Sequence, residues 1–544
     1  MSATDILPSV TDIEGESNVR QQTKLWRVAA GVGVVLALGA ATACSSDSGP
    51  VRSKHDSSEE PPEVAAANGP LAGDPDATTA ELTCLAEADN APWSPTMAAF
   101  EVHDSARTHL YGCATFGGSE TDDNQVFAST SQDRYVTPYN MVDQGPDALF
   151  VYGGGYGDSP DASGSFVSRV APDTFNEVWR RVLINTKTTG EWNYPGVLNT
   201  MADGGLVVIF GHQIAKLDAQ TGSVLARATL PTGSSKPENT AYNGFDALPD
   251  GTIIAKTVNR QPGCTEQGFS AFLQCPDPAS APASVLVAID PATLEVIDQV
   301  ELPEMMGGRV TTTVSDDGDA RIYLPGATKL YRYTFADGRF AVDTGWGPVS
   351  YLKDGQTAAS AMAVIGDYVV GMTNGGAPTS TPMSVFAVSQ TDSSKVANLQ
   401  PFADAGADNS FIPSMVSVDP DNQRVYVMDA GAGKLGAIDL ENGKLTTAWT
   451  QDQRTLSFTT LVGPSDKRVL IGTDIPVRTF KGLQDYTVEQ VVWRDADSGK
   501  ELARTSDLPK MTTGILVTPG YGGRQHYLAA DGQIFDLQVL PTAD

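Results

Sequence analysis

The sequence contains few of the residues that most often carry catalysis and metal binding. Of 544 residues, five are histidine and five are cysteine. No two cysteines have the C-x-x-C spacing, and no histidine lies near a cysteine pair at the distance that a zinc finger needs. There is no G-x-S-x-G nucleophile elbow and no H-E-x-x-H motif. These absences argue against a metal site and against the common hydrolase signatures.

Cations are also scarce. The chain has 36 Lys and Arg against 66 Asp and Glu, which gives a formal net charge of -30. Affinity for nucleic acid and for anionic lipid comes from clustered cations. The composition therefore makes nucleic acid an unexpected partner, and solubility explains the acidity.

Only one long apolar run is present, at residues 28–43, directly after Arg20, Lys24 and Arg27. Basic residues, a short apolar stretch and small residues at its end are the layout of an export signal. The run is shorter than the roughly 20 residues that comfortably cross a bilayer. A signal peptide is therefore favoured over a permanent anchor.

A cysteine follows this run at once. The letters "AATAC", which end at Cys44, resemble a bacterial lipobox, although Ala41 stands where the pattern usually has Leu. The resemblance implies that Cys44 is lipid-modified and becomes the mature N-terminus at the outer face of the cell membrane. An uncleaved signal anchor and free secretion are the alternatives. All three place the rest of the chain outside the cytoplasm.

The four other cysteines are Cys84, Cys113, Cys264 and Cys275. An even set in an exported protein predicts two disulfides. Four cysteines allow three pairings, and the simplest joins Cys84 to Cys113 and Cys264 to Cys275.

Residues 45–83 contain mainly Ser, Asp, Glu, Pro and Ala, with almost no large apolar side chains. Such a segment buries too little surface to offset the entropy cost of ordering. We expect a signal or anchor at residues 1–44, a flexible tether at 45–83 and one folded domain at 84–544.

The folded domain repeats one pattern, an alternating strand, an Asp-led turn and a second alternating strand. Clear copies are "IAKLDAQTGSVLARATL", "VLVAIDPATLEVIDQVEL", "LGAIDLENGKLTTAW" and "VVWRDADSGKELARTSDL". Another hairpin, such as "VLNTMADGGLVVIF", precedes each copy. Two hairpins make a four-stranded unit, and a period of about 40 to 60 residues is typical of β-propeller blades.

We count eight units and predict an all-β, eight-bladed β-propeller; seven blades plus a small N-terminal module is the alternative. The eighth unit lacks a strand, and we expect residues 97–116 to close the ring by pairing with it, stapled by Cys84–Cys113. The units begin near Asn140, Gly196, Asn243, Arg309, Ala359, Pro413, Thr459 and Gly514.

The phrases "LDAQTGSVL" and "RDADSGKEL" resemble the D-A-x-T-G-K-x-L-W repeat of quinoprotein-like (PQQ-like) propellers, and other copies resemble YVTN-type repeats of extracytoplasmic propellers. In the dehydrogenases, this resemblance implies a quinone over a bound calcium and, in alcohol-oxidising members, an adjacent cysteine pair. The sequence has no adjacent cysteine pair and no matching calcium motif. No cofactor is therefore expected and no catalytic residue is assigned.

Two features indicate a binding mouth. The segments "PYNMV", "NYPGV" and "AYNGF" place Tyr139, Tyr194 and Tyr242 at equivalent positions before the first strands of three units. These segments converge on the central channel, where the tyrosines would hold a ligand; packing between blades is the alternative. The connection between the second and third strands is long in units one, three, five and seven, and long loops on rigid scaffolds often carry function.

Together these features predict an exported, lipid-anchored propeller that binds an envelope protein or a cell-wall glycan without catalysis. A lyase, hydrolase or quinone-dependent oxidoreductase working in the channel is the alternative.

Overall fold

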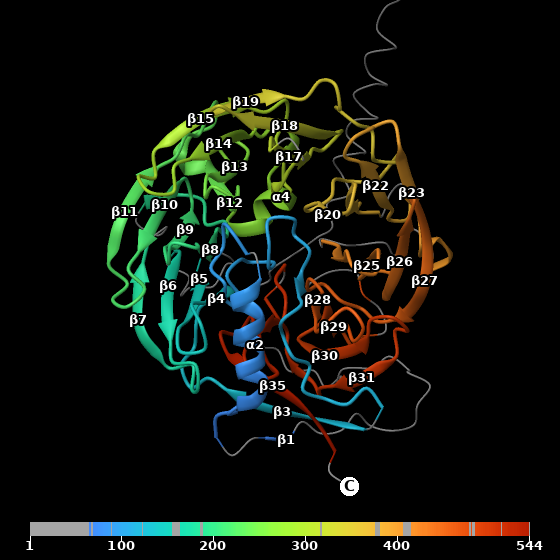
Figure 1. Ribbon diagram of the computed structural model, residues 1–544. Helices are drawn as coiled ribbons and strands as arrows, with labels where there is room; N and C mark the ends of the chain where they lie inside the picture. The colour runs from blue at the N-terminus through green and yellow to red at the C-terminus, as the bar shows by residue number, and fades with distance from the viewer. Residues whose placement is uncertain are drawn as a thin grey trace, which may run out of the picture.

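The chain forms a ring of eight β-sheets (Figure 1). The computed structural model describes residues 65–66, 69–88, 90–121, 123–154, 164–184, 189–315, 318–375, 381–405, 415–477, 480, 485–512 and 514–542. The expected signal or anchor at 1–44, including Cys44, and residues 45–64 of the tether lie outside these ranges. Within the described chain, no helix has both the length and the apolar character needed to cross a membrane.

Each blade is an antiparallel sheet of four strands that run, in chain order, from the centre of the ring to its rim in blades 1 to 7. The prediction of eight blades is confirmed. Blade 1 consists of β4 (Pro138–Asp143), β5 (Leu149–Gly153), β6 (Phe166–Val170) and β7 (Glu177–Val182), and blade 2 of β8 (Val197–Thr200), β9 (Leu206–Phe210), β10 (Gln213–Leu217) and β11 (Val224–Thr229). Blade 3 consists of β12 (Thr240–Ala247), β13 (Ile253–Asn259), β14 (Val285–Ile289) and β15 (Val296–Glu301), and blade 4 of β16 (Thr311–Val314), β17 (Ala320–Pro325), β18 (Leu330–Ala336) and β19 (Arg339–Val342).

The remaining blades follow the same plan, with a few added short strands. Blades 5 and 6 are β20 (Ala363–Ile365), β21 (Tyr368–Met372), β22 (Val385–Ser389) and β23 (Val396–Leu399), and β24 (Ser417–Asp419), β25 (Arg424–Asp429), β26 (Lys434–Glu441) and β27 (Lys444–Asp452). Blade 7 is β28 (Thr460–Val462), β29 (Val469–Asp474), β30 (Val488–Asp495) and β31 (Glu501–Arg504), with β2 (Leu110–Tyr111) beside β28 and β32 (Leu508–Pro509) beside β30. Blade 8 is β33 (Thr518–Pro519), β34 (Arg524–Leu528), β35 (Ile534–Pro541) and β3 (Asn124–Thr130), with β1 (Ala65–Ala66) outside β3.

Local turn chemistry shapes the outer hairpin of each blade. In blade 2, the carboxylate of Asp218 accepts hydrogen bonds from the backbone N–H groups two and three residues further on (3.1 and 2.7 Å), and Gly222 ends the turn at φ +66°. Asp290 and Asp495 hold the equivalent turns of blades 3 and 7. The repeated Asp-led phrase is therefore the sequence of this turn.

Burial follows the position of a strand in its blade. The second strand of blade 2, β9, reads "LVVIF" and is buried throughout, whereas the outermost strand, β11, alternates half-buried and exposed residues. Inner strands are covered on both faces because each blade packs against its two neighbours. The core is thus spread around the ring between successive blades.

An N-terminal strand closes the ring, as predicted, but it is not the expected one. β3 pairs with β35 in antiparallel register from Asn124 opposite Pro541 to Thr130 opposite Phe535. The segment expected in this place, residues 97–116, lies in the middle of the ring instead (Figure 1). We call residues 97–116 the axial segment.

The axial segment hydrogen-bonds to the innermost strands of successive blades. Its carbonyl oxygens at Ala98, Ala99, Ala106, Thr108 and His109 accept from the backbone N–H groups of blades 1, 2, 5, 6 and 7, at 2.8 to 2.9 Å. The hydroxyl of Ser105 donates to the Ala247 carbonyl of blade 3. Eight inner strands arranged around an axis leave backbone groups facing the centre, and the axial segment satisfies several of them.

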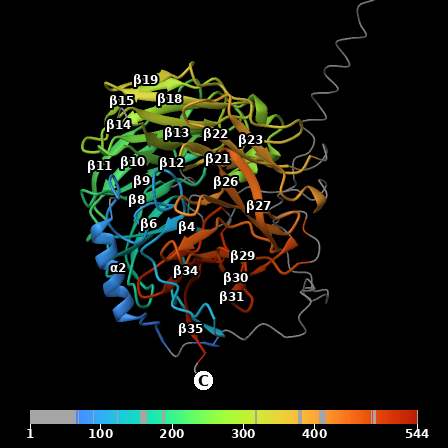
Figure 2. The ribbon, with the colours of Figure 1, turned by 45° about the vertical axis from the view of Figure 1, so that its right-hand side comes forward.

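The propeller has two unlike faces. We call the side with the turns between first and second strands the turn face, and the side with the connections between second and third strands the loop face. A helix, α2 (Pro75–Glu87), lies on the turn face, where the Asp74 N–H donates to the carbonyl of Gly522 in the β33–β34 turn (3.0 Å). Figure 2 shows α2 outside the sheets, along one side of the ring.

The presence of α2 corrects the expected extent of the tether, residues 45–83. The side chain of Asp74 caps the helix by accepting from the N–H of Asp76 (2.9 Å), and a proline opens its first turn. The buried carboxylate of Glu81 accepts from the N–H of Gly522 (2.7 Å). Polar contacts to the turn face order this segment. The composition of the segment did not indicate these contacts.

Both disulfides join the pairs expected from local pairing. Cys84–Cys113 ties α2 to the axial segment on the turn face. Cys264–Cys275 closes a loop of blade 3 on the opposite face. The disulfide Cys84–Cys113 was expected to link the ring closure, but it joins α2 to the axial segment. The closure itself is made by backbone pairing of β3 with β35.

Candidate ligand site at the loop face

The loop face carries the predicted alternation of long and short connections. The long ones are residues 154–165, 260–284, 373–384 and 475–487 in blades 1, 3, 5 and 7; the short ones are 211–212, 326–329, 430–433 and 529–533. Only the blade 3 connection is described throughout among the long four. The site that the described residues define is therefore built around this loop.

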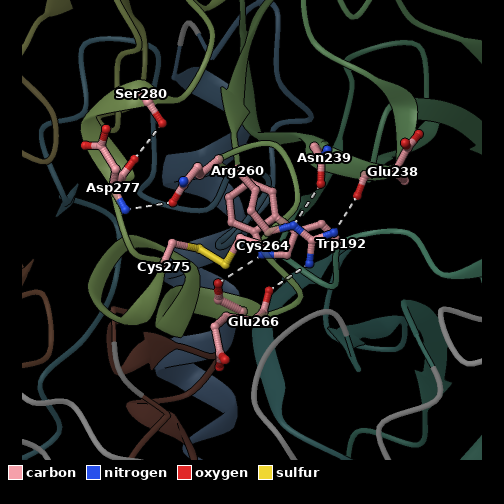
Figure 3. The surroundings of a disulfide bond; sticks show 11 residues. Trp192, Glu238, Asn239, Arg260, Cys264, Glu266, Cys275, Asp277 and Ser280 are labelled. Atoms are coloured by element: carbon pink, nitrogen blue, oxygen red, sulfur yellow. Dashed lines mark hydrogen bonds between the residues drawn. A yellow bond between two sulfur atoms is a disulfide. The ribbon is translucent and has the colours of Figure 1, made fainter.

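The disulfide loop of blade 3 is held rigidly (Figure 3). It contains η2 (Gly268–Ser270), α4 (Ala271–Gln274) and η3 (Pro278–Ser280). The guanidinium of Arg260 donates to the Asn239 side chain (3.0 Å) and to the carbonyls of Glu266 (2.8 Å) and Glu238 (2.9 Å). One buried arginine thus fastens the loop to the segment that leads into blade 3.

Two aromatic side chains of the loop, Phe269 and Phe272, pack with Trp192 and Tyr194 from the preceding connection. We call these four residues the aromatic lip. The ring centroids of Trp192 and Tyr194 are 4.8 Å apart, and each lies about 5.5 Å from Phe272. Trp192 is fully buried, and its indole donates to the Gly268 carbonyl (3.1 Å). The other three rings are half-buried. The lip therefore presents apolar ring surface from a rigid base.

Two of the three predicted tyrosines, Tyr139 and Tyr194, both interact with Arg309. Tyr139 lies near the loop-face end of β4, where its hydroxyl accepts from Nη2 of Arg309 (2.5 Å). Tyr194 lies in the aromatic lip, and the charge of Arg309 also acts on its phenol. Burial raises the pKa of both tyrosines, so both hydroxyls stay protonated.

Tyr242 does not reach this site. Its ring is fully buried, and its hydroxyl donates to the Pro231 carbonyl (2.7 Å) in the connection between blades 2 and 3. Tyr242 therefore packs between blades, which is the alternative stated for all three tyrosines.

Under Tyr139 lies a buried polar group that the sequence did not indicate. Glu101 of the axial segment pairs through one carboxylate oxygen with Nη1 of Arg107 (2.8 Å) and through the other with Nε of Arg309 (3.2 Å). Nζ of Lys256 donates to the Asn243 side chain (3.0 Å) and to a backbone carbonyl. We call Glu101, Arg107, Arg309 and Lys256 the central cluster.

The four side chains of the central cluster are buried. A cavity beside Glu101 and Tyr139 has a volume of about 10 Å³ and is also lined by Phe458, Gly514 and Ile515. This is room for about one water molecule. Residues from the axial segment and from four blades meet here, and their wide separation in the chain left no local signal of the cluster.

His109 lies close to the cluster but is held in a structural role. Its Nδ1 donates to the Thr459 carbonyl (3.0 Å), and the ring is fully buried. Burial lowers its pKa to about 4, so the imidazole is neutral at physiological pH.

The described residues do not fit a quinone held over a calcium ion. Within the ranges described, no three His, Cys, Asp or Glu side chains form a group that could hold a metal. Both carboxylate oxygens of Glu101 are engaged by arginines. Glu101 is therefore committed to these two ion pairs and does not serve as a calcium ligand.

Comparison with known proteins supports the fold. No protein-family model matches the chain, and no curated protein matches it. Among solved structures, the chain is similar to the quinohemoprotein alcohol dehydrogenase from Comamonas testosteroni, with a TM-score of 0.52 and 12% identity over 86% of this chain and 84% of that one. It is also similar to a europium-containing methanol dehydrogenase, with a TM-score of 0.50 and 9% identity over 82% of this chain and 90% of that one. The chain has the propeller fold of the quinoprotein dehydrogenases, and at these identities the likeness concerns fold alone.

Proposed function

From this propeller fold and the aromatic lip on its loop face, we propose an exported, lipid-anchored binding protein that acts without catalysis. Its ligand is a cell-wall glycan, which packs against the lip. The proposal depends on the half-buried rings of Tyr194 and Phe272. Phe272 belongs to the loop that the disulfide closes, and Tyr194 packs against it. Such rigid aromatic faces bind the apolar faces of sugar rings at little entropy cost.

The helix α2 lies on the turn face, and the aromatic lip lies on the opposite face. Two disulfides suit an oxidising compartment.

The direct test is co-sedimentation of the full-length protein with insoluble cell wall. Tyr194→Ala and Phe272→Ala are expected to weaken retention, because each removes ring surface from the lip. Tyr368→Ala is the control, since Tyr368 is also half-buried but begins β21 at the turn-face end of blade 5. Equal retention of all variants would reject the lip as the site, and retention only when envelope proteins are present would favour a protein partner.

The anchor has a separate test. Radiolabelled palmitate is expected to label the wild-type protein and not Cys44→Ala. Label in both proteins, or in neither, would contradict lipidation at Cys44.

A channel enzyme is the alternative, because Glu101, Arg107 and Arg309 are the charged groups that such an enzyme would use. It is less favoured, since both carboxylate oxygens of Glu101 are paired with arginines.

A further inference from the structure

We propose that Arg309 is a specificity residue that receives a carboxylate of the ligand, so that the glycan is an acidic saccharide. This inference rests on the glycan-binding function proposed above and names the class of sugar. The ring of the saccharide packs on the aromatic lip, and its carboxylate points toward the central cluster.

The hydrogen bonds of Arg309 leave part of its guanidinium available. Nε faces Glu101 (3.2 Å) and donates to the Asn243 carbonyl (3.2 Å), and Nη2 donates to the Tyr139 hydroxyl (2.5 Å). Nη1 has no acceptor among the described residues. The side chain is 10% exposed. A planar fork held on one side and open on the other is the arrangement that binds a carboxylate.

The charges around Arg309 also favour the binding of an anion. Two guanidinium groups, those of Arg107 and Arg309, share the single carboxylate of Glu101. The hydrogen bonds of Lys256 go to uncharged acceptors. Nη2 of Arg107 is buried without a hydrogen-bond partner. A further carboxylate nearby, Asp246, has its pKa raised to about 7 by burial.

This local surplus contrasts with a chain whose net charge is -30. Burial, with the charges of Arg309 and Arg107, lowers the pKa of Lys256 well below its usual value. Like charges in a poorly solvated place repel one another, and an arriving anion would relieve that repulsion. The acidic surface elsewhere disfavours anions, so this place is distinctive on the molecule.

Arg309, which donates to Tyr139, and Tyr194 of the aromatic lip both lie at the loop-face ends of inner strands. The positive charge of Arg309 acts on the phenol of Tyr194, and Tyr194 contacts Trp192 and Phe272. A ligand on the lip would therefore lie within range of the positive charge of Arg309. A sugar ring that carries a carboxylate offers both complementary groups, whereas a neutral sugar offers only the first.

The test compares two disaccharides by calorimetry on the full-length protein in detergent. The acidic probe is N-acetylglucosaminyl-N-acetylmuramic acid, and the neutral probe is N,N′-diacetylchitobiose (hereafter chitobiose), which lacks the lactyl carboxylate. Wild type is expected to bind the acidic probe at least about tenfold more tightly. In Arg309→Gln the ratio of the two Kd values is expected to fall to about one. Tyr194→Ala weakens both probes, and Tyr368→Ala changes neither.

Arg309→Lys covers the case in which Arg309→Gln fails to fold, because it keeps the charge beside Glu101. It is expected to retain folding and to lose most of the preference for the acidic probe, since an ammonium lacks the bidentate fork. Equal wild-type affinity for both probes would overturn the inference; if Tyr194→Ala then still weakened chitobiose binding, the proposed function would stand. If the protein binds neither sugar and captures an acidic peptide, both the inference and the proposed function are wrong.

Discussion

At the scale of single residues, Glu101 connects the parts of the molecule that meet at its centre. It comes from the axial segment and pairs with Arg107 of the same segment and with Arg309 from the start of blade 4. Its carboxylate is almost completely buried, and it contacts both guanidinium groups directly. The ion pairs therefore hold the axial segment in register with the ring.

Removing this charge is expected to be costly. Glu101→Gln leaves two buried guanidinium groups without a counter-charge, so the free energy of unfolding should fall by about 3 to 5 kcal/mol. Denaturant unfolding measures the change. Glu177→Gln is the matched control, because its pair with Arg180 is about one-third exposed and should contribute under about 1 kcal/mol. Similar losses in the two variants would contradict a special role for Glu101.

Asp246 gives a pH-dependent prediction. Burial raises its pKa from 3.8 to about 7 in the folded protein, while the unfolded chain releases the same proton near 3.8. The folded state therefore binds more protons between these values, and stability from this group falls as pH rises through that window. The wild type should lose stability relative to Asp246→Asn between pH 5 and pH 8, measured as urea midpoints.

The control for this experiment is Asp290→Asn. Backbone N–H donation from Thr293 lowers the pKa of Asp290 below 3.8, so its carboxylate is ionised throughout that range. The difference between wild type and Asp290→Asn should not change from pH 5 to pH 8. A constant difference for Asp246→Asn as well would show that Asp246 titrates normally.

At the scale of elements, the outer hairpins link neighbouring blades. Trp179 of β7 packs on the turn of blade 2, where its indole donates to the Ala219 carbonyl (3.3 Å). Trp449 of β27 makes the same contact with the Ala496 carbonyl of blade 7 (3.1 Å). The glycine in each turn leaves room for the tryptophan of the preceding blade. The glycine of the repeat therefore serves the turn and the contact between blades together.

Two glycine variants separate these effects. Gly204 and Gly222 both have positive φ, at +77° and +66°. A Cβ at Gly204 meets open space, whereas a Cβ at Gly222 would lie 2.5 Å from the Trp179 ring. Gly204→Ala should cost about 1 kcal/mol from backbone strain, and Gly222→Ala about 1 to 3 kcal/mol more. Equal thermal unfolding midpoints for the two variants would contradict the contact between blades.

At the scale of the whole molecule, two N-terminal pieces complete a ring built by the rest of the chain. β3 supplies the outer strand of blade 8, and the axial segment occupies the centre. Closure leaves no open sheet between the last blade and the first. The stability of the ring thus depends on contacts between residues about 400 positions apart, such as Ser129 opposite Asp536.

Opening the closure should affect the whole ring. Val126 of β3 is buried, and Val126→Asp places a charge inside blade 8, so we expect a loss of more than about 3 kcal/mol and a larger radius by X-ray scattering. Val178→Asp is the control, because Val178 also lies on an outermost strand but is 57% exposed. It should change stability by under about 0.5 kcal/mol. An unchanged radius with normal stability in Val126→Asp would show that the ring does not need this strand.

The sequence alone determined the four-stranded blades and the places where they begin, and it favoured the number of blades and the pairing of the cysteines that the structure has. These features depend on local patterns: alternating side chains, Asp-led turns and glycines recur within each blade, and each pair of cysteines is close in the chain. The same locality made the alternation of loop lengths predictable. It also singled out Tyr139 and Tyr194, whose role in binding a ligand stays a prediction.

Only the tertiary structure decided which N-terminal segment closes the ring, what fills its centre and which charges meet there. The axial segment was expected to pair with the last blade, and its local preferences did not show that it would lie at the centre of the ring while β3 makes the closure. Glu101 and Arg309 are brought together by ring closure, and α2 is held by polar contacts with the turn face. Such contacts follow from the arrangement of distant segments, because their energies appear only when the ring has formed.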